Sequence, residues 1–111
     1  MKNIIVIKKI VLAGTALFLA NCINSACKNQ YQYVYDRHSI QDARTHNEIG
    51  FSSIRGGNLV GEHSVLFLGE HETIEIKHTA YSREVYAEGA IRAARFIIEQ
   101  KCGLYGMEHL L

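Results

Sequence analysis

The stretch GEHSVLFLGEHETIEIKHTA, residues 61–80, decides the fold of this chain. It predicts two strands, at residues 64–68 and 73–80, because apolar residues cluster in the first and alternate with polar ones in the second. Ile74, Ile76 and His78 then share one face of the second strand. The glycine and charged residues at 69–72 predict a hairpin turn between the two strands.

Two earlier segments extend this sheet. Residues 49–54 predict a strand, and tyrosines at positions 31, 33 and 35 alternate with other residues at the period of a strand. The polar segment 36–47 between them predicts a loop. Gly56 and Gly57 do not form a dinucleotide-binding fingerprint, because they lie between two predicted strands, and we expect them to be turn residues.

Two helices are expected. Residues 15–26 predict a buried helix with apolar positions at Leu17, Ala20, Cys22 and Ile23. Residues 82–101 predict a long C-terminal helix, capped by Ser82 and ended at Lys101 by a left-handed Gly103. An apolar stripe on this second helix is typical of core packing; it consists of Val85, Gly89, Ala93 and Ile97.

Composition favours one compact domain in a reduced compartment. The chain has 111 residues and a formal charge of +1, without the clustered lysines and arginines that a nucleic-acid partner requires. Its three cysteines form no dense framework, which favours the cytoplasm. His71 and Glu72 lack the second histidine of a zinc helix, so we expect no metal.

The N-terminus allows two interpretations. Lys2, an apolar run at 10–20 and the pair Asn21-Cys22 are typical of a secretory signal. The run is too short to span a bilayer, so we expect no membrane partner. In the other interpretation, residues 14–20 open a helix that packs on the sheet, which explains the identity of these residues as well as their apolarity.

Several blocks of sequence occur together in one order: Glu48-Ile-Gly, Arg55-Gly-Gly, Gly61-Glu-His-Ser-Val, Ile76-Lys-His-Thr-Ala-Tyr-Ser-Arg and Gly103-Leu-Tyr-Gly-Met. This series resembles the C-terminal part of 4-hydroxy-tetrahydrodipicolinate reductase, or dihydrodipicolinate reductase. The resemblance runs from about Lys8 to the C-terminus. The family uses NADPH or NADH in the diaminopimelate route to lysine.

The resemblance and the predicted elements imply an α+β fold: a mixed β-sheet of about four strands with a helix on one face and a long C-terminal helix. Residues 1–81 would form the substrate-binding and tetramerisation domain. Residues 82–111 would form a helix and tail that in the family pack on the nucleotide-binding domain, which this chain is expected to lack. We therefore expect a homo-oligomer, a tetramer in the family, and a separate nucleotide-binding chain as a possible partner.

Candidate site residues follow from the same resemblance. Lys8 matches a lysine that contacts the cyclic dicarboxylate substrate and takes part in proton transfer, while Gly14 and Thr15 match the substrate-binding Gly-Thr pair. An ammonium beside the free N–H groups of a helix start suits a carboxylate. The alternative is that Lys8 is simply a solvated residue before a buried helix.

Arg83 and Tyr86 match residues at the cleft between substrate and nucleotide. The resemblance assigns both to cofactor binding, and it allows Arg83 to contact either the substrate or a cofactor phosphate. The alternative for Arg83 is an ordinary pair with Glu84 or Glu88. Arg55, Glu62 and His63 are expected to form a structural polar network near the sheet and the tetramer interface.

The chain departs from the family at essential positions. Ile4 and Ile5 stand where the family has two histidines, one of them the general acid, and Leu12 stands at the position of a turn-setting proline. Isoleucine cannot transfer a proton, so we expect no turnover from this chain alone. The alternatives are a non-catalytic module for assembly or dicarboxylate binding, and an exported protein with an N-terminal signal.

Overall fold

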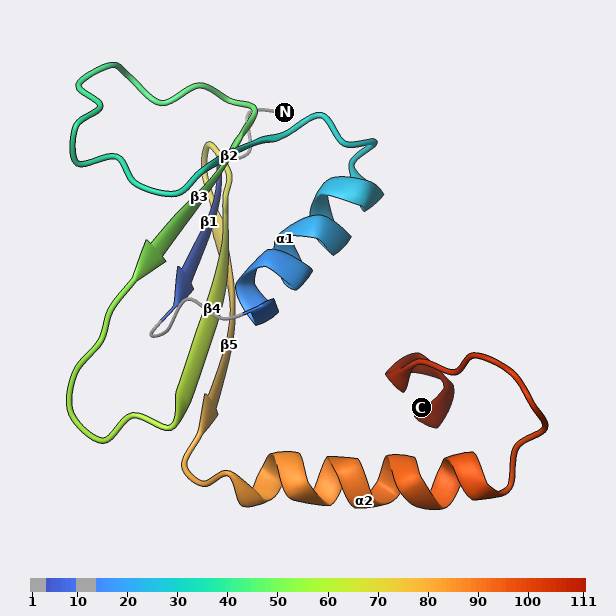
Figure 1. The fold of residues 1–111 in the computed structure, drawn as a ribbon. Helices are drawn as coiled ribbons and strands as arrows, with labels where there is room; N and C mark the ends of the chain where they lie inside the picture. Colours follow the sequence, from blue (N-terminus) through green and yellow to red (C-terminus); the bar gives the residue numbers. More distant parts are fainter. Residues whose placement is uncertain (1–3, 10–13) are drawn as a thin grey trace. The chain divides into compact units, whose positions relative to one another are not determined.

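The computed structural model of the chain describes residues 4–9 and 14–111 (Figure 1). Its contacts divide it into two units, Met1–Thr79 and Ala80–Leu111, and each unit is described by itself. The elements in chain order are β1 (Ile4–Lys9), α1 (Gly14–Ala26), β2 (Gln32–Val34), β3 (Glu48–Ser53), β4 (Gly61–Leu68), β5 (Thr73–Ala80), α2 (Glu84–Ile98) and the 3₁₀ helix η1 (Met107–Leu110).

A five-stranded sheet in the order β2-β3-β1-β4-β5 forms the base of the first unit. Its central strand, β1, runs parallel to β3 and antiparallel to β4, and β2 runs parallel to β3. The mixed sheet and the two α-helices confirm the predicted α+β fold. The sequence predicts about four strands, and the additional one is β1.

The other strands lie close to their predicted positions. β5 has the predicted bounds, β3 is displaced by one residue, and β4 begins three residues earlier than predicted, at Gly61. The turn between β4 and β5 is confirmed, because the Gly69 N–H donates to the Glu72 carbonyl at 2.8 Å. Gly57, between β3 and β4, has a φ of 56°, a left-handed conformation that favours glycine in this turn.

Helix α1 covers one face of the sheet (Figure 1). Ala16 and Ala20 are buried against Ile49 of β3 and Val65 of β4, and their small side chains let the helix approach the strands closely. The predicted helix at 15–26 is thus confirmed. Cys22 was expected to add to the apolar face, which is wrong, because it lies on the exposed side of the helix.

Polar contacts join the end of α1 to β2. Lys28 and Asn29 adopt left-handed conformations, with φ of 62° and 55°, and the chain turns there after the helix. The Asn24 side-chain amide then exchanges two hydrogen bonds of 3.0 Å with the backbone of Tyr31.

Among the described residues, no helix combines the length and the apolarity needed to cross a membrane.

Helix α2 begins close to its predicted start and ends earlier than predicted. The Ser82 hydroxyl accepts a hydrogen bond of 3.1 Å from the Glu84 N–H, but the N-cap position of the helix is Arg83 and not Ser82 as predicted. The predicted end at Lys101 with a left-handed Gly103 is wrong. Glu99 closes the helix in a right-handed conformation, φ −90°, and its N–H donates to the Phe96 carbonyl at 3.2 Å.

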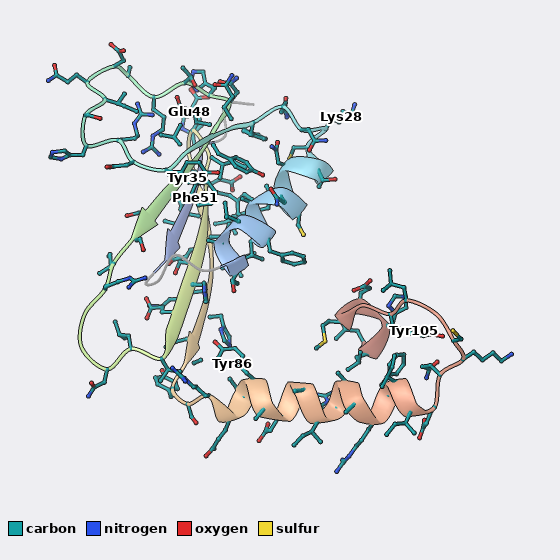
Figure 2. All side chains as sticks on the ribbon, in the orientation of Figure 1. Lys28, Tyr35, Glu48, Phe51, Tyr86 and Tyr105 are labelled. Carbon is teal, nitrogen blue, oxygen red and sulfur yellow. The ribbon has the colours of Figure 1, made fainter. Side chains whose placement is uncertain are left out.

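The apolar stripe of α2 is not part of a core. None of the residues of α2 is buried, and Val85 and Ile97 are 47% and 49% exposed, so core packing was a wrong prediction for this unit. The reason is that η1 and the segment before it cover only the end of the helix, where Phe96 contacts the Tyr105 ring edge to face at 5.8 Å. Figure 2 shows the Tyr105 side chain beside this end of α2.

Candidate functional site

The residues expected to bind a carboxylate come from the end of β1 and the start of α1. These two ends lie at the same end of the sheet, because α1 runs back along the strands (Figure 1). In the register of the sheet, Lys8 is opposite Ser52 of β3 and Ser64 of β4. The substituted proline position, Leu12, lies outside the described residues.

The first turn of α1 is open to a ligand. Gly14 and Thr15 are both exposed, and a Cβ added to Gly14 would meet nothing within 4 Å. The turn contains no acidic side chain. Its free N–H groups and the positive end of the helix dipole therefore favour an anion at this position.

Arg83 and Tyr86 belong to the second unit. Arg83 directly precedes α2, and its carbonyl accepts a hydrogen bond from the Tyr86 N–H at 3.1 Å. Both side chains are exposed, Tyr86 by 50%. The alternative pairing of Arg83 with Glu84 or Glu88 is not formed, since none of the ion pairs among the described residues includes Arg83.

An ion pair that sequence reasoning missed fixes the loop at 36–47. The Arg37 guanidinium donates from Nη1 to the Glu48 carboxylate and from Nη2 to the Asp42 carbonyl at 3.0 Å. Thr45 adds a hydroxyl bond of 2.9 Å to Glu48. The Glu48-Ile-Gly block was the only sequence signal for this cluster, and nothing in the spacing identified Arg37 as its partner.

These contacts shift the titration of Glu48. The hydrogen bond from the Thr45 hydroxyl, with smaller contributions from the Thr45 N–H and the charges of Arg37 and Arg44, lowers the pKa of Glu48, while burial opposes the shift. A carboxyl whose pKa is lowered by folding stabilises the fold when ionised. This contribution is present above the unfolded pKa and is lost as the pH falls through the folded value.

A second polar cluster joins β4 to β5. The Glu62 carboxylate pairs with the Lys77 ammonium at 2.9 Å and accepts a bond from the Thr79 hydroxyl at 3.4 Å. Glu62 therefore forms part of a polar network on the sheet, as expected. Arg55 was expected to belong to this network, which is wrong: it is exposed in the loop after β3, without a hydrogen bond or ion pair to the described residues.

Comparisons with known proteins agree with this architecture. The family model described as "Dihydrodipicolinate reductase, C-terminus" matches residues 8–111. The 4-hydroxy-tetrahydrodipicolinate reductase of Caldanaerobacter subterraneus subsp. tengcongensis is 49% identical over 104 residues, which cover 94% of this chain and 41% of that protein. The enzyme of the same name from Syntrophobacter fumaroxidans is 49% identical over 107 residues, 95% of this chain and 40% of that protein.

A solved structure shows the same fold. The dipicolinate-bound dihydrodipicolinate reductase from Paenisporosarcina sp. TG-14 superposes with a TM-score of 0.69 at 22% identity, covering 99% of this chain and 44% of that one. The chain thus has the fold of an α+β domain with a helix on one face of a mixed sheet. It belongs to the dihydrodipicolinate reductase family, in which it matches the C-terminal part. It spans about 40% of the length of the curated relatives it matches.

Proposed function

We propose that this chain is the substrate-binding and assembly part of a 4-hydroxy-tetrahydrodipicolinate reductase. The whole enzyme would reduce a cyclic dicarboxylate to tetrahydrodipicolinate with NADPH or NADH, in the cytoplasmic route to diaminopimelate and lysine. The observation that carries the proposal is the family match over residues 8–111, together with relatives of that name at 49% identity.

The substrate end of the chain supplies charge and hydrogen-bond donors. Lys8 would pair with one substrate carboxylate, and the N–H groups at Gly14 and Thr15 would bind it at the start of α1. The exposed first turn and its lack of acidic residues support this role. These residues bind and orient the ring, and Lys8 can hold a proton beside it.

Among the described residues, Arg83 and Tyr86 are those that we propose to contact a nicotinamide nucleotide, and they suit only part of it. An exposed guanidinium at Arg83 suits a phosphate, and the half-exposed Tyr86 ring offers a flat surface beside it. When bound, the nucleotide supplies the hydride. The role of the residues described here is then to hold the substrate, and reduction requires a nucleotide-binding part in addition to them.

A second candidate function is a non-catalytic module that binds a dicarboxylate or only assembles. It is favoured by Ile4 and Ile5 at the start of β1, because the residues that match the family's histidines carry no titratable group. Binding of a dicarboxylate without any gain of activity on addition of a nucleotide-binding partner would favour this module over the reductase part.

Binding of pyridine-2,6-dicarboxylate tests the substrate site. Lys8→Ala should weaken binding by about ten- to a hundredfold, since a hydrogen bond to a charged group contributes roughly 1.5–3 kcal/mol. Lys9→Ala is the matched control with the same loss of net charge, and it should change the affinity much less. Calorimetric titration of the two variants measures the difference. Equal losses would show that only diffuse positive charge attracts the ligand.

Self-association should follow from the exposed apolar residues of the edge strand β5. Ile74 and Ile76 are 55% and 62% exposed there, and an uncovered edge with apolar side chains favours pairing with another chain. Sedimentation at micromolar concentration should give a mass above that of a monomer. Ile76→Lys should lower this mass, whereas Glu70→Lys in the hairpin turn should not. A monomer at all concentrations would contradict the proposed assembly.

A further inference from the structure

A pocket of about 290 Å³ lies between the loop at 36–47 and the strands β2 and β3. This volume is at the lower end of the range for ligand pockets and suits a small ion or molecule. The side of β3 and the loop both contribute to it. Its lining consists of Val34, Asp36, Arg37, His38, Arg44, Gly50, Phe51 and Ser52.

Two guanidinium groups line this pocket, and their situations differ. Arg37 is held in place by the Glu48 carboxylate and the Asp42 carbonyl, and its side chain is only 21% exposed. Arg44 is half-buried, and within the described residues it forms no hydrogen bond or ion pair. Its charge lowers the pKa of Glu48 without direct contact. A guanidinium in a partly enclosed site without a hydrogen-bonded partner is suited to an external anion.

The acidic residue of the lining, Asp36, does not form an ion pair with Arg44. One oxygen of Asp36 accepts a hydrogen bond of 2.9 Å from the His38 N–H, so the carboxylate is engaged with the backbone of its own loop. Glu48 is occupied by Arg37 and by Thr45. The Arg44 charge is therefore only partly offset inside the pocket.

The remaining walls favour a bound oxyanion. Phe51 stacks on Tyr35 with a centroid distance of 5.1 Å, and Figure 2 shows these two rings side by side. Of these two rings Phe51 lines the pocket, and charge interactions are stronger beside an apolar surface than in open water. The Ser52 hydroxyl and the His38 ring add donors that have no hydrogen-bond partner among the described residues.

We propose that this pocket binds a small oxyanion, a phosphate or a carboxylate group, with Arg44 as its principal charge partner. Arg37 would add a second, pre-oriented guanidinium, and Ser52 would add a hydroxyl donor. Gly14 and Thr15 do not line the pocket, so the site makes use of different residues from those at the start of α1.

Amide NMR of the whole chain tests this site with inorganic phosphate as the probe and sodium chloride at equal ionic strength as the reference. Phosphate should produce saturable shifts at the amides of Gly50, Phe51 and Ser52, and chloride should not. Acetate in a parallel titration distinguishes the two sources: tighter phosphate binding assigns a phosphate site, and tighter acetate binding a carboxylate site. Shifts that stay linear for both anions would overturn the proposal.

Arg44→Gln should weaken binding of the preferred anion by about ten- to a hundredfold, because it removes the charge-assisted bonds. Arg55→Gln removes the same charge from an exposed position outside the pocket and should leave the affinity within about twofold. Retained dispersion of the amide spectrum shows that the variants are folded. Should Arg44→Gln disturb the loop, Ser52→Ala provides a second variant, with an expected loss of a few-fold. Equal effects of the two arginine variants would overturn the site.

Discussion

Ile49→Ala should destabilise the first unit by about 2–5 kcal/mol, the range measured when a large aliphatic side chain is removed from a core. Ile49 has no exposed surface, and it packs in the cluster that contains Ala16 and Ala20 of α1 and Val65 of β4. Neither alanine is large enough to fill the space that the missing atoms would leave. Denaturant unfolding followed by circular dichroism measures the loss.

Ile54→Ala is the matched control for this experiment. Ile54 follows β3 directly and is 48% exposed, so the same truncation should destabilise the unit by no more than about 0.5 kcal/mol. A similar loss for both variants would contradict the packing of α1 on the sheet. A small loss for Ile49→Ala would contradict it as well.

The strands β3, β4 and β5 and the two α-helices could be predicted from sequence because each follows a local rule. Residues 73–80 alternate at the period of a strand, and the Ser82 hydroxyl accepts a hydrogen bond from the Glu84 N–H at the start of α2. The end of α2 was mispredicted because Gly103 is a generic stop signal. In this chain the helix ends before that glycine. The Gln100 side chain donates to the Phe96 carbonyl at 3.3 Å, a contact that sequence rules for helix ends do not include.

Strand β1 was missed although its sequence carries a clear signal. Four consecutive β-branched residues, Ile4–Ile7, are typical of a buried strand, and β1 does pair on both sides with β3 and β4. The resemblance to the family instead matches these positions to two histidines and a lysine. Periodicity alone cannot separate such a run from the start of a signal sequence, and the neighbours that decide between them lie about 45 and 60 residues further along the chain.

The candidate site was predicted only in part, for a related reason. Helix starts such as Gly14 and Thr15 can be located from local sequence, and the structure places them exposed in the first turn of α1. The contact of Arg37 with Glu48 joins residues eleven positions apart in sequence, and no local rule pairs them. The arginines of this loop were missed as pocket residues because the segment contains polar residues without any periodic pattern.

The 111-residue chain should not oxidise NADPH or NADH in the presence of the cyclic substrate. A missing general acid typically costs about 10²–10⁴ in rate, and we propose that Ile4 and Ile5 stand in place of the family's histidines. The measurement is the loss of nicotinamide absorbance in an assay with purified chain. Any turnover above a control without protein would contradict both the proposed inactivity and the importance given to these positions.

A fusion tests the proposed role of the acid separately from that of the nucleotide site. When the nucleotide-binding part of the Caldanaerobacter reductase is joined to this chain, the unmodified fusion should stay slow, because the acid is still absent. The double variant Ile4→His, Ile5→His should then be about 10²–10⁴ faster. Both residues lie in the central strand, opposite Leu68 and Phe67, so the amide spectrum must first show that the sheet tolerates two imidazoles.

Ile7→His, in the same strand but outside the matched pair, is the control and should bring no gain. Equal rates for the unmodified fusion and the double variant, with the sheet intact, would show that the acid comes from elsewhere.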